Sequence, residues 1–240
     1  MGRTLFAATR GFVLVALTLT APMLSFASPA SDELQKLLSS GSARRYVSMT
    51  QALTSIIAIS DAENLPSMVL VDRFREGAAK SAPADALVAA GQLELDRLRV
   101  VARLLRESGN VSLREPARVY GTLSLCLRAG LDQGSLAQLI HASGVGGIDR
   151  AVGVCETLLK LTGITTLNEG ELARLGKALL NSRVPLSGYG ALVGVFAKAR
   201  GARLDDGTTL DLVVSVLERG GGLLQVNDSV EAASRRGTSR

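Results

Sequence analysis

Apolar side chains recur along this chain with the spacing of one face of an α-helix. In the middle of the chain, Leu98, Val101 and Leu105 fall at positions i, i+3 and i+7, which places all three on the same side of a helix. No stretch alternates apolar and polar residues for long enough to indicate a strand. Glycines and prolines interrupt the apolar pattern at intervals, so the chain reads as an all-α protein. The predicted helices span residues 31–40, 44–60, 66–80, 83–108, 114–129, 132–143, 147–162, 168–182, 185–200 and 205–219.

Three related stretches mark the starts of later helices. An Asp or Asn side-chain oxygen just before a helix accepts a hydrogen bond from an amide of the first turn. Glu171, three residues after Asn168, completes a capping box, and Leu167 and Leu172 form a hydrophobic staple around it. The stretches are LDQGSLAQL at 131–139, LNEGELARL at 167–175 and LDDGTTLDL at 204–212, with caps predicted at Asp132, Asn168 and Asp205.

The sequence does not predict a metal site, either in these three stretches or among the two cysteines and the single histidine. An EF-hand loop places calcium ligands at alternate positions before its glycine and a glutamate at its end. Asp205, Asp206 and Gly207 are adjacent, and no alternate ligand precedes them. Structural zinc takes four Cys or His ligands, whereas His141 is the only histidine and the two cysteines lie on different predicted helices. We therefore predict no metal and no cofactor.

The caps recur at a nearly constant interval. Asp132 and Asn168 are 36 residues apart, and Asn168 and Asp205 are 37 apart. The turns that begin at Ser143 and Ser182 are 39 residues apart. A single two-helix unit of this length cannot bury both of its apolar faces, so neighbouring units have to stack. The predicted fold is a right-handed stack of antiparallel helical hairpins, similar to an α-solenoid, with units of about 36–39 residues.

The first residues have the layout of a secretory signal peptide. Arg3 and Arg10 flank the start of an uncharged apolar segment, and Ala27 ends a small-residue cleavage sequence, with Ala30 as the second candidate. This layout is typical of a cleaved signal, and the segment is too short and too broken by proline to indicate a transmembrane helix. We expect residues 1–27 to be removed and the protein to be periplasmic or secreted, with no stable membrane span after cleavage.

The mature chain is predicted to be one domain with a neutral charge balance. Residues 28–220 form the single α-helical repeat domain, and residues 221–240 form a flexible C-terminal tail with few core residues. The first 27 residues hold two of the 27 basic residues and the last six hold three, which leaves 22 basic against 22 acidic residues in 28–234. A nucleic-acid-binding protein shows a net basic surface with aromatic side chains for stacking. This chain has no tryptophan and only three tyrosines, so we predict no nucleic-acid partner.

The two cysteines occupy core positions of their predicted helices. Cys126 lies in helix 114–129 and Cys155 in helix 147–162, which are alternate helices of the stack and would lie side by side. Paired cysteines of exported proteins often form disulfides, but cysteine also packs as a small apolar residue. The sequence does not give the Cα separation that a disulfide requires. We favour two separate buried thiols and retain the disulfide as the alternative.

A basic stripe and two tyrosines are the candidate binding residues. Arg99, Arg103 and Arg106 share one face of the long helix. Acids three or four residues away are placed to pair with them, and a solvated face is the favoured interpretation of the stripe alone. Together with Tyr120 and Tyr189, however, they are the residue types that dominate binding hot spots. The predicted shared surface is one layer of the helices that begin near residues 83, 116, 147 and 185.

The predicted function is non-catalytic. A single histidine leaves little scope for a catalytic triad, and the paired acids near helix starts already have a role in capping. We expect an exported binding or scaffold module for another envelope macromolecule, with a protein as partner and no predicted oligomeric state. The alternatives are a small-molecule or lipid carrier with an enclosed inter-helix cavity and an enzyme with an unrecognised carboxylate and arginine site. A cleft with two carboxylates of strongly shifted pKa would favour the enzyme.

Overall fold

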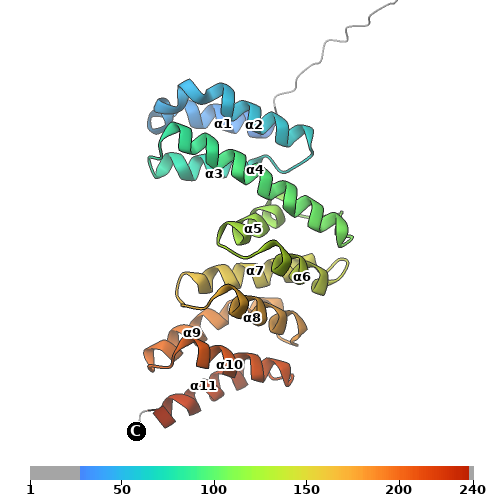
Figure 1. Ribbon diagram of the computed structural model, residues 1–240, viewed down its shortest axis with the longest axis vertical. Helices are drawn as coiled ribbons and strands as arrows, with labels where there is room; N and C mark the ends of the chain where they lie inside the picture. The colour runs from blue at the N-terminus through green and yellow to red at the C-terminus, as the bar shows by residue number, and fades with distance from the viewer. Residues whose placement is uncertain (1–27, 238–240) are drawn as a thin grey trace, which may run out of the picture.

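The computed structural model describes residues 28–237, and these residues form helices joined by short turns, with no strand among them (Figure 1). The all-α class is therefore confirmed. The predicted signal peptide, residues 1–27, and residues 238–240 lie outside the described residues. The α-helices are α1 (Pro29–Ser39), α2 (Thr50–Ala62), α3 (Met68–Ala79), α4 (Ala84–Glu107), α5 (Pro116–Arg128), α6 (Gln133–Ser143), α7 (Ile148–Thr162), α8 (Glu169–Asn181), α9 (Ala191–Gly201), α10 (Asp206–Glu218) and α11 (Leu223–Gly237). Two 3₁₀ segments, η1 (Gly41–Met49) and η2 (Leu186–Gly188), precede α2 and α9.

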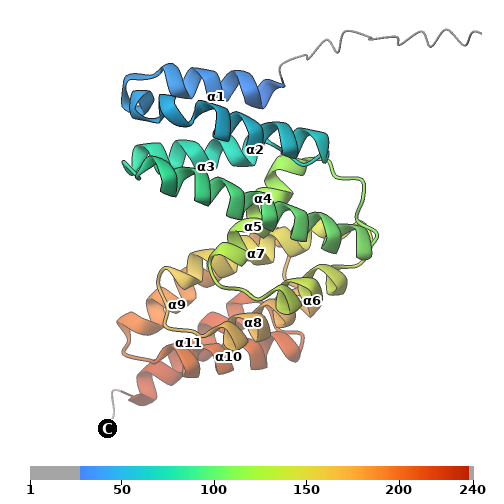
Figure 2. The ribbon, with the colours of Figure 1, turned by 45° about the horizontal axis from the view of Figure 1, so that its top comes forward.

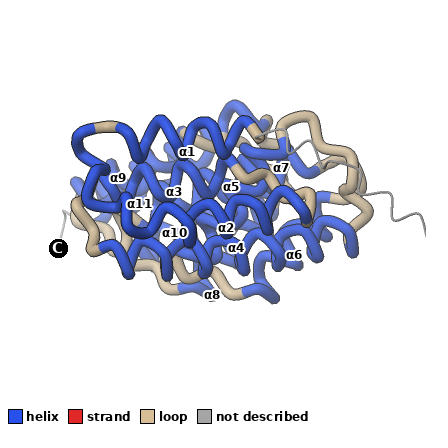
Figure 3. Tube along the Cα trace, turned by 90° about the horizontal axis from the view of Figure 1, so that it is seen from above, coloured by secondary structure: helices blue, strands red, loops and turns tan. Residues whose placement is uncertain are grey.

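Each helix packs against the helix two places further along the chain. The helices α1, α3, α5, α7, α9 and α11 contact one another in that order, and we name them the odd row. The helices α2, α4, α6, α8 and α10 do the same and form the even row. Seen from above, the two rows lie beside each other (Figure 3). Consecutive helices such as α7 and α8 also pack together, so the two rows pack against each other.

The apolar side chains gather into two cores that meet at α4. The first core lies among α1, η1, α2, α3 and α4 and includes the fully buried Phe74 and Leu98. The second runs from α4 to α11 and includes Val101, Leu105 and Leu123. With 24 residues, α4 is long enough to reach from beside α3 to beside α6 (Figure 2). The apolar face of α4 therefore contributes Leu98 to the first core and Val101 and Leu105 to the second.

Asp132, Asn168 and Asp205 are the N-cap residues of α6, α8 and α10. Asp132 Oδ1 accepts a hydrogen bond from the backbone N–H of Gly134 at 2.6 Å, and Asp205 Oδ1 accepts one from a first-turn N–H of α10 at 2.8 Å. Asn168 and Glu171 form the complete capping box, with N···O distances of 3.0 and 2.7 Å. The three recurring stretches therefore begin helices, as their residues predict.

The first residue of α8 and of α10 also reaches back to the preceding hairpin. Glu169 Oε1 accepts a hydrogen bond from the backbone N–H of Asp132 at 2.7 Å. Asp206 Oδ2 accepts one from the backbone N–H of Thr166 at 2.7 Å and pairs with Arg200 Nη2 at 2.7 Å. Burial raises the pKa of the Asp206 carboxyl, but the hydrogen bonds from Thr166 and the charge of Arg200 outweigh it and hold this pKa below its ordinary value. These acids therefore link successive hairpins.

The glycine that follows in each stretch leaves room for the capping side chain. A Cβ on Gly134 would lie 2.9 Å from Asp132 Oδ1, and a Cβ on Gly207 would lie 3.3 Å from Asp205 Oδ1. Both distances are shorter than most real Cβ contacts. A side chain at Gly134 or Gly207 would therefore crowd the oxygen that caps the helix, whereas a Cβ on Gly170 would lie 3.4 Å from Asn168 Oδ1, an ordinary contact.

The helix boundaries differ from the prediction in three places. The 3₁₀ segment η1 replaces the first part of the predicted helix 44–60, and η2 precedes α9 where a helix was expected to start at residue 185. The third difference is α11, which occupies most of the segment expected to be a flexible tail. Its Val226 and Val230 are buried against the second core. Leu223, which also packs against this core, Val226 and Val230 fall at positions i, i+3 and i+7, so the apolar spacing of a helix was present in this segment and was missed.

The predicted layer that combines the long helix with the helices starting near residues 116, 147 and 185 does not form. Instead α4 packs with α6 in the even row, whereas α5, α7 and α9 belong to the odd row. Two helices joined by a short turn run antiparallel and take opposite sides of a hairpin. Because α4 and α5 are consecutive, they fall in different rows.

Candidate functional site

The arginine stripe of α4 is largely engaged in ion pairs. Arg99 Nε and Nη2 donate hydrogen bonds to the two carboxylate oxygens of Glu63, the C-cap residue of α2, at 2.8 and 2.6 Å. Its Nη1 donates to the acid one turn earlier in α4 at 2.8 Å. The Nε atom of Arg103 lies 3.9 Å from Oε1 of Glu107 in the same helix. The side chain of Arg106 is exposed. Arg99 therefore joins α2 to α4, and the stripe is not a row of free cations.

The two predicted binding tyrosines are not on a common exposed surface. Tyr189 is buried, with 1% of its surface exposed. Its hydroxyl accepts a hydrogen bond from Arg150 Nε at 2.7 Å and donates one to the backbone oxygen of Leu179 at 3.2 Å. Tyr120 is partly buried against both cores, and burial raises the pKa of its hydroxyl while the charge of Arg106 opposes that shift. Only Tyr120 lies near the stripe, and Tyr189 is inaccessible to a partner.

The structure brings Cys126 and Cys155 together. Cys126 lies in α5 and Cys155 in α7, which are neighbours in the odd row. Both are buried free thiols. The sulfur of Cys126 donates a hydrogen bond to the backbone oxygen of Cys155 at 3.8 Å. The side-by-side helices that the disulfide alternative requires are thus present.

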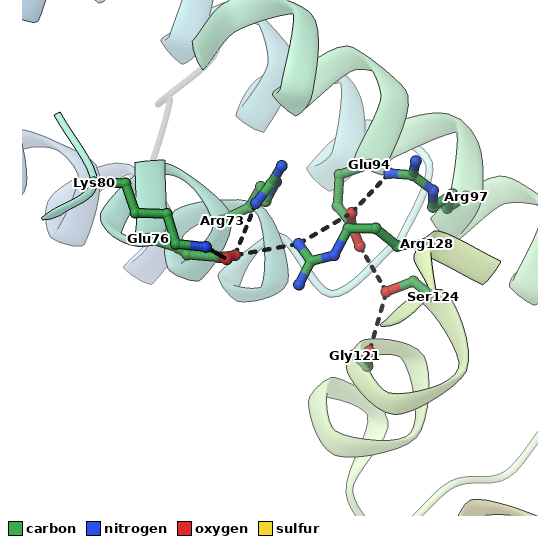
Figure 4. A network of polar contacts seen from close by, with 8 residues as sticks. All are labelled: Arg73, Glu76, Lys80, Glu94, Arg97, Gly121, Ser124 and Arg128. Carbon is green, nitrogen blue, oxygen red and sulfur yellow. Dashed lines mark hydrogen bonds and ion pairs between the residues drawn. The ribbon is translucent and has the colours of Figure 1, made fainter. Parts of the chain in front are cut away.

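A polar cluster that the sequence analysis does not identify lies among α3, α4 and α5 (Figure 4). Its central carboxylate belongs to Glu94 of α4, which is buried with 2% exposed. Glu94 Oε1 accepts a hydrogen bond from Ser124 Oγ at 2.6 Å, and Oε2 accepts one from Arg97 Nη1 at 3.2 Å. Arg128 Nη1 lies 4.0 Å from Oε2. These contacts tie α4 to α5 where the two hydrophobic cores meet.

Glu76 of α3 forms the other half of the cluster. Its carboxylate oxygens accept hydrogen bonds from Lys80 Nζ at 2.6 Å, Arg73 Nη1 at 2.8 Å and Arg128 Nη1 at 3.2 Å. The hydrogen bond from Lys80, supported by Arg73 and Arg128 and opposed by burial, lowers the pKa of Glu76 from 4.5 to about 2. Arg128 thus bridges Glu76 and Glu94 and links α3, α4 and α5.

The contacts of this cluster hold α3, α4 and α5 together, which is a structural role. A cleft of about 340 Å³ opens beside the carboxylates of Glu76 and Glu94. General acid–base catalysis, however, needs a group whose pKa lies near the working pH. A carboxylate with a pKa of about 2 is a weak proton acceptor. Interlocked ion pairs also shift pKa values when their role is structural, and here they span the boundary between the two cores.

The sequence does contain a signal for this cluster. Leu87, Gly91, Leu98 and Leu105 are buried positions of α4 at intervals of one or two helical turns. Glu94 falls in the same register, three residues after Gly91 and four before Leu98. An acid among core positions is rarely buried unless it is paired. The acidic residue at a core position of this helix is therefore the feature of the sequence from which a buried, paired carboxylate could have been predicted.

An open groove of about 730 Å³ lies on the even row, between the end of α4 and the helices α6 and α8. We name it the even-row groove. Its floor includes the nearly buried Leu104 and Leu139. The small side chains of Ala137, Ala142 and Ala173 line it and leave the space between the helices unfilled. A second cavity of about 420 Å³ shares part of this lining and continues the groove to α10.

The rim of the even-row groove carries charged side chains, some of them without partners. Lys177 of α8 and His141 of α6 line it and are exposed, and neither has an ion-pair partner within the part of the chain that the structure describes. Arg174 is paired with Asp211 of α10 at 2.6 Å. Glu107 pairs with an arginine of its own helix at 3.9 Å. Lys177 is therefore the cation of this rim that has no ion-pair partner among the described residues.

Two further properties of residues 28–237 bear on the classes of function. No group of three or more His, Cys, Asp and Glu side chains in this range is arranged to hold a metal ion. In the same range, no helix combines the length and the apolar character that crossing a membrane requires.

No protein-family model, no curated protein and no solved structure matches this chain.

Proposed function

We propose that this protein is a non-catalytic binding module that holds a segment of another protein in the even-row groove. The observation that carries the proposal is the groove itself, with its apolar floor and its free donors Lys177 and His141. Side chains of a bound segment would fill the space above Ala137 and Ala173, as in other helix-lined grooves. The unpaired charge of Lys177 favours a segment that carries carboxylates, because charge complementarity selects partners.

The repeated contacts between hairpins support a helical repeat architecture, similar to an α-solenoid, for this module. The caps of α6, α8 and α10 recur in sequence, and Glu169 and Asp206 each link a helix to the preceding hairpin. Stacked hairpins of this kind present a continuous row of helices, and such rows commonly serve as binding surfaces. The even-row groove crosses helices of successive hairpins, so it depends on the stack and on no single unit.

Export through residues 1–27 is part of the proposal. The first residues have the layout of a signal peptide, and on this basis we infer that the bound partner is in the periplasm or outside the cell. A carrier would enclose its ligand, whereas the even-row groove is only partly enclosed and is followed by a second cavity toward α10. This extent favours a macromolecular segment over a small enclosed ligand.

A peptide-display selection on the immobilised protein tests this function. The selected peptides are expected to share carboxylate side chains and at least one apolar residue. Lys177→Glu should abolish their capture, because it reverses the free charge on the groove. The matched control is Lys160→Glu, which makes the same change on the exposed surface of α7 in the odd row and should leave capture intact. Capture that survives Lys177→Glu would remove the groove as the binding site.

A further inference from the structure

The contact between α5 and α7 places the two cysteines of the chain in a reactive arrangement. These are the only cysteines in the sequence, and their exposed fractions are 2% for Cys126 and 0% for Cys155. The sulfur of Cys126 lies against the backbone of residue 155, 3.8 Å from its oxygen. A disulfide requires the two Cβ atoms to face one another across a short gap, and packed neighbours in one row satisfy that requirement better than separate core sites.

The two thiols differ in their access to solvent. A cavity of about 210 Å³ opens beside the turn between α5 and α6, and Cys126 lines it together with Leu131 and Leu158. Cys155 is not among the residues that line this cavity. A small reagent that enters from the solvent therefore meets the sulfur of Cys126 first.

The electrostatic environment points to the same order. The side-chain hydrogen bond between the two thiols and burial both raise the pKa of the Cys155 thiol well above its ordinary value. Because the thiolate is the nucleophile in disulfide exchange, this contact lowers the reactivity of Cys155. Once the sulfur of Cys126 is engaged, that hydrogen bond is lost and Cys155 is positioned to act second.

We propose that Cys126 and Cys155 are a dithiol–disulfide pair that a small organic disulfide oxidises in two steps. In the first step the Cys126 sulfur attacks the reagent, whose S–S bond breaks, and a mixed disulfide and one released thiol are formed. In the second step the Cys155 sulfur displaces the remaining half of the reagent as a second thiol. Both protons and both electrons of the dithiol end on the two released thiols, and one new S–S bond joins α5 to α7 across 29 residues of chain.

Incubation of the folded protein with bis(2-hydroxyethyl) disulfide tests the proposal. The intact mass should fall by two hydrogens, and the protein should then take up no maleimide after unfolding in denaturant. Reduction with dithiothreitol should restore uptake at both cysteines. Two reactive thiols after the same incubation, with the protein still folded by circular dichroism, would overturn the pair.

The single variants test the order of attack. Cys155→Ser should accumulate the mixed disulfide on Cys126, whereas Cys126→Ser should form the adduct on Cys155 about ten-fold more slowly, because Cys155 does not line the cavity through which the reagent enters. In denaturant the two rates should become equal, which shows that the fold causes the difference. Equal rates in the folded variants would overturn the assigned order. If a serine variant does not fold, Cys155→Ala and Cys126→Ala replace the pair, because alanine leaves no unsatisfied hydroxyl in the core.

Discussion

Replacing Ser124 with alanine is expected to lower the free energy of unfolding by about 1–2.5 kcal/mol. Ser124 Oγ donates a hydrogen bond of 2.6 Å to Glu94 Oε1, and only 3% of the Glu94 side chain is exposed. A hydrogen bond to a charged group contributes about 1.5–3 kcal/mol. The higher helix propensity of alanine offsets about 0.5 kcal/mol of that loss.

A double-mutant cycle separates the contribution of the charge from the rest. Glu94→Gln keeps the acceptor oxygen and the shape of the side chain but removes the charge. In that background Ser124→Ala removes only a neutral hydrogen bond, which contributes about 0.5–1.5 kcal/mol. We therefore expect a coupling energy of about 1 kcal/mol between the two sites. Glu94→Gln is itself expected to be destabilising, because Arg97 and Arg128 lose the negative charge between them.

Urea unfolding followed by far-UV circular dichroism measures each free energy. The matched control is Ser215→Ala, which makes the same substitution at an exposed position within α10 and should change the free energy by less than about 0.5 kcal/mol. An effect of Ser124→Ala no larger than this control would refute the reasoning. Equal losses of unfolding free energy on Ser124→Ala in the wild-type and Glu94→Gln backgrounds would also refute it, because the hydrogen bond between Ser124 and residue 94 would then not depend on the charge.

Three other predictions concern the caps, the ion pairs and the N-terminus. Asn168→Ala should lower the unfolding free energy by about 1 kcal/mol through loss of the capping box; calcium that raised the melting temperature of the wild type alone would contradict this interpretation. The pKa of Glu76 falls from 4.5 to about 2 on folding, so its stabilisation is complete above pH 4.5 and is lost as the pH falls toward 2. Glu76→Gln should therefore flatten the pH dependence of the urea midpoint in that window, and an unchanged slope would count against the ion pairs. Mass spectrometry of exported protein should find Ser28 at the N-terminus, because cleavage after Ala27 retains the Ser28 Oγ that accepts the Ser31 N–H at 3.2 Å and caps α1; intact Met1 would oppose a cleaved signal.

Local signals in the sequence predict the helices well because their causes are local. Asp132, Asn168 and Asp205 begin helices since a capping oxygen needs only the next three residues. The same reasoning fails for the packing of α11, whose two buried valines depend on the surface that α9 and α10 present. It also fails at η1, where the apolar spacing is compatible with a helix but the backbone takes the tighter 3₁₀ form.

Non-local features account for the errors at the candidate site. Tyr189 is buried because it packs in the second core, where its hydroxyl is paired with Arg150, 39 residues earlier in the chain. Placement of α4 in the even row follows from the alternation of rows, which separates Arg99 from the helices of the odd row. The even-row groove arises from small residues on α6 and α8, and no single helix contains it. Glu94 is the exception, because an acidic residue at a buried position of the apolar pattern of α4 can be recognised from the sequence alone.

Binding of an acidic peptide to the even-row groove is the central claim, and a titration tests it most directly. The dissociation constant of one display-selected peptide is measured at low ionic strength for the wild type, Lys177→Glu and Lys160→Glu. The account predicts about a ten-fold or greater loss of affinity for Lys177→Glu, which replaces an attraction by a repulsion. It predicts less than about a two-fold change for Lys160→Glu, whose position lies on the odd row. Equal affinities for all three proteins, or equal losses in both variants, would contradict the account.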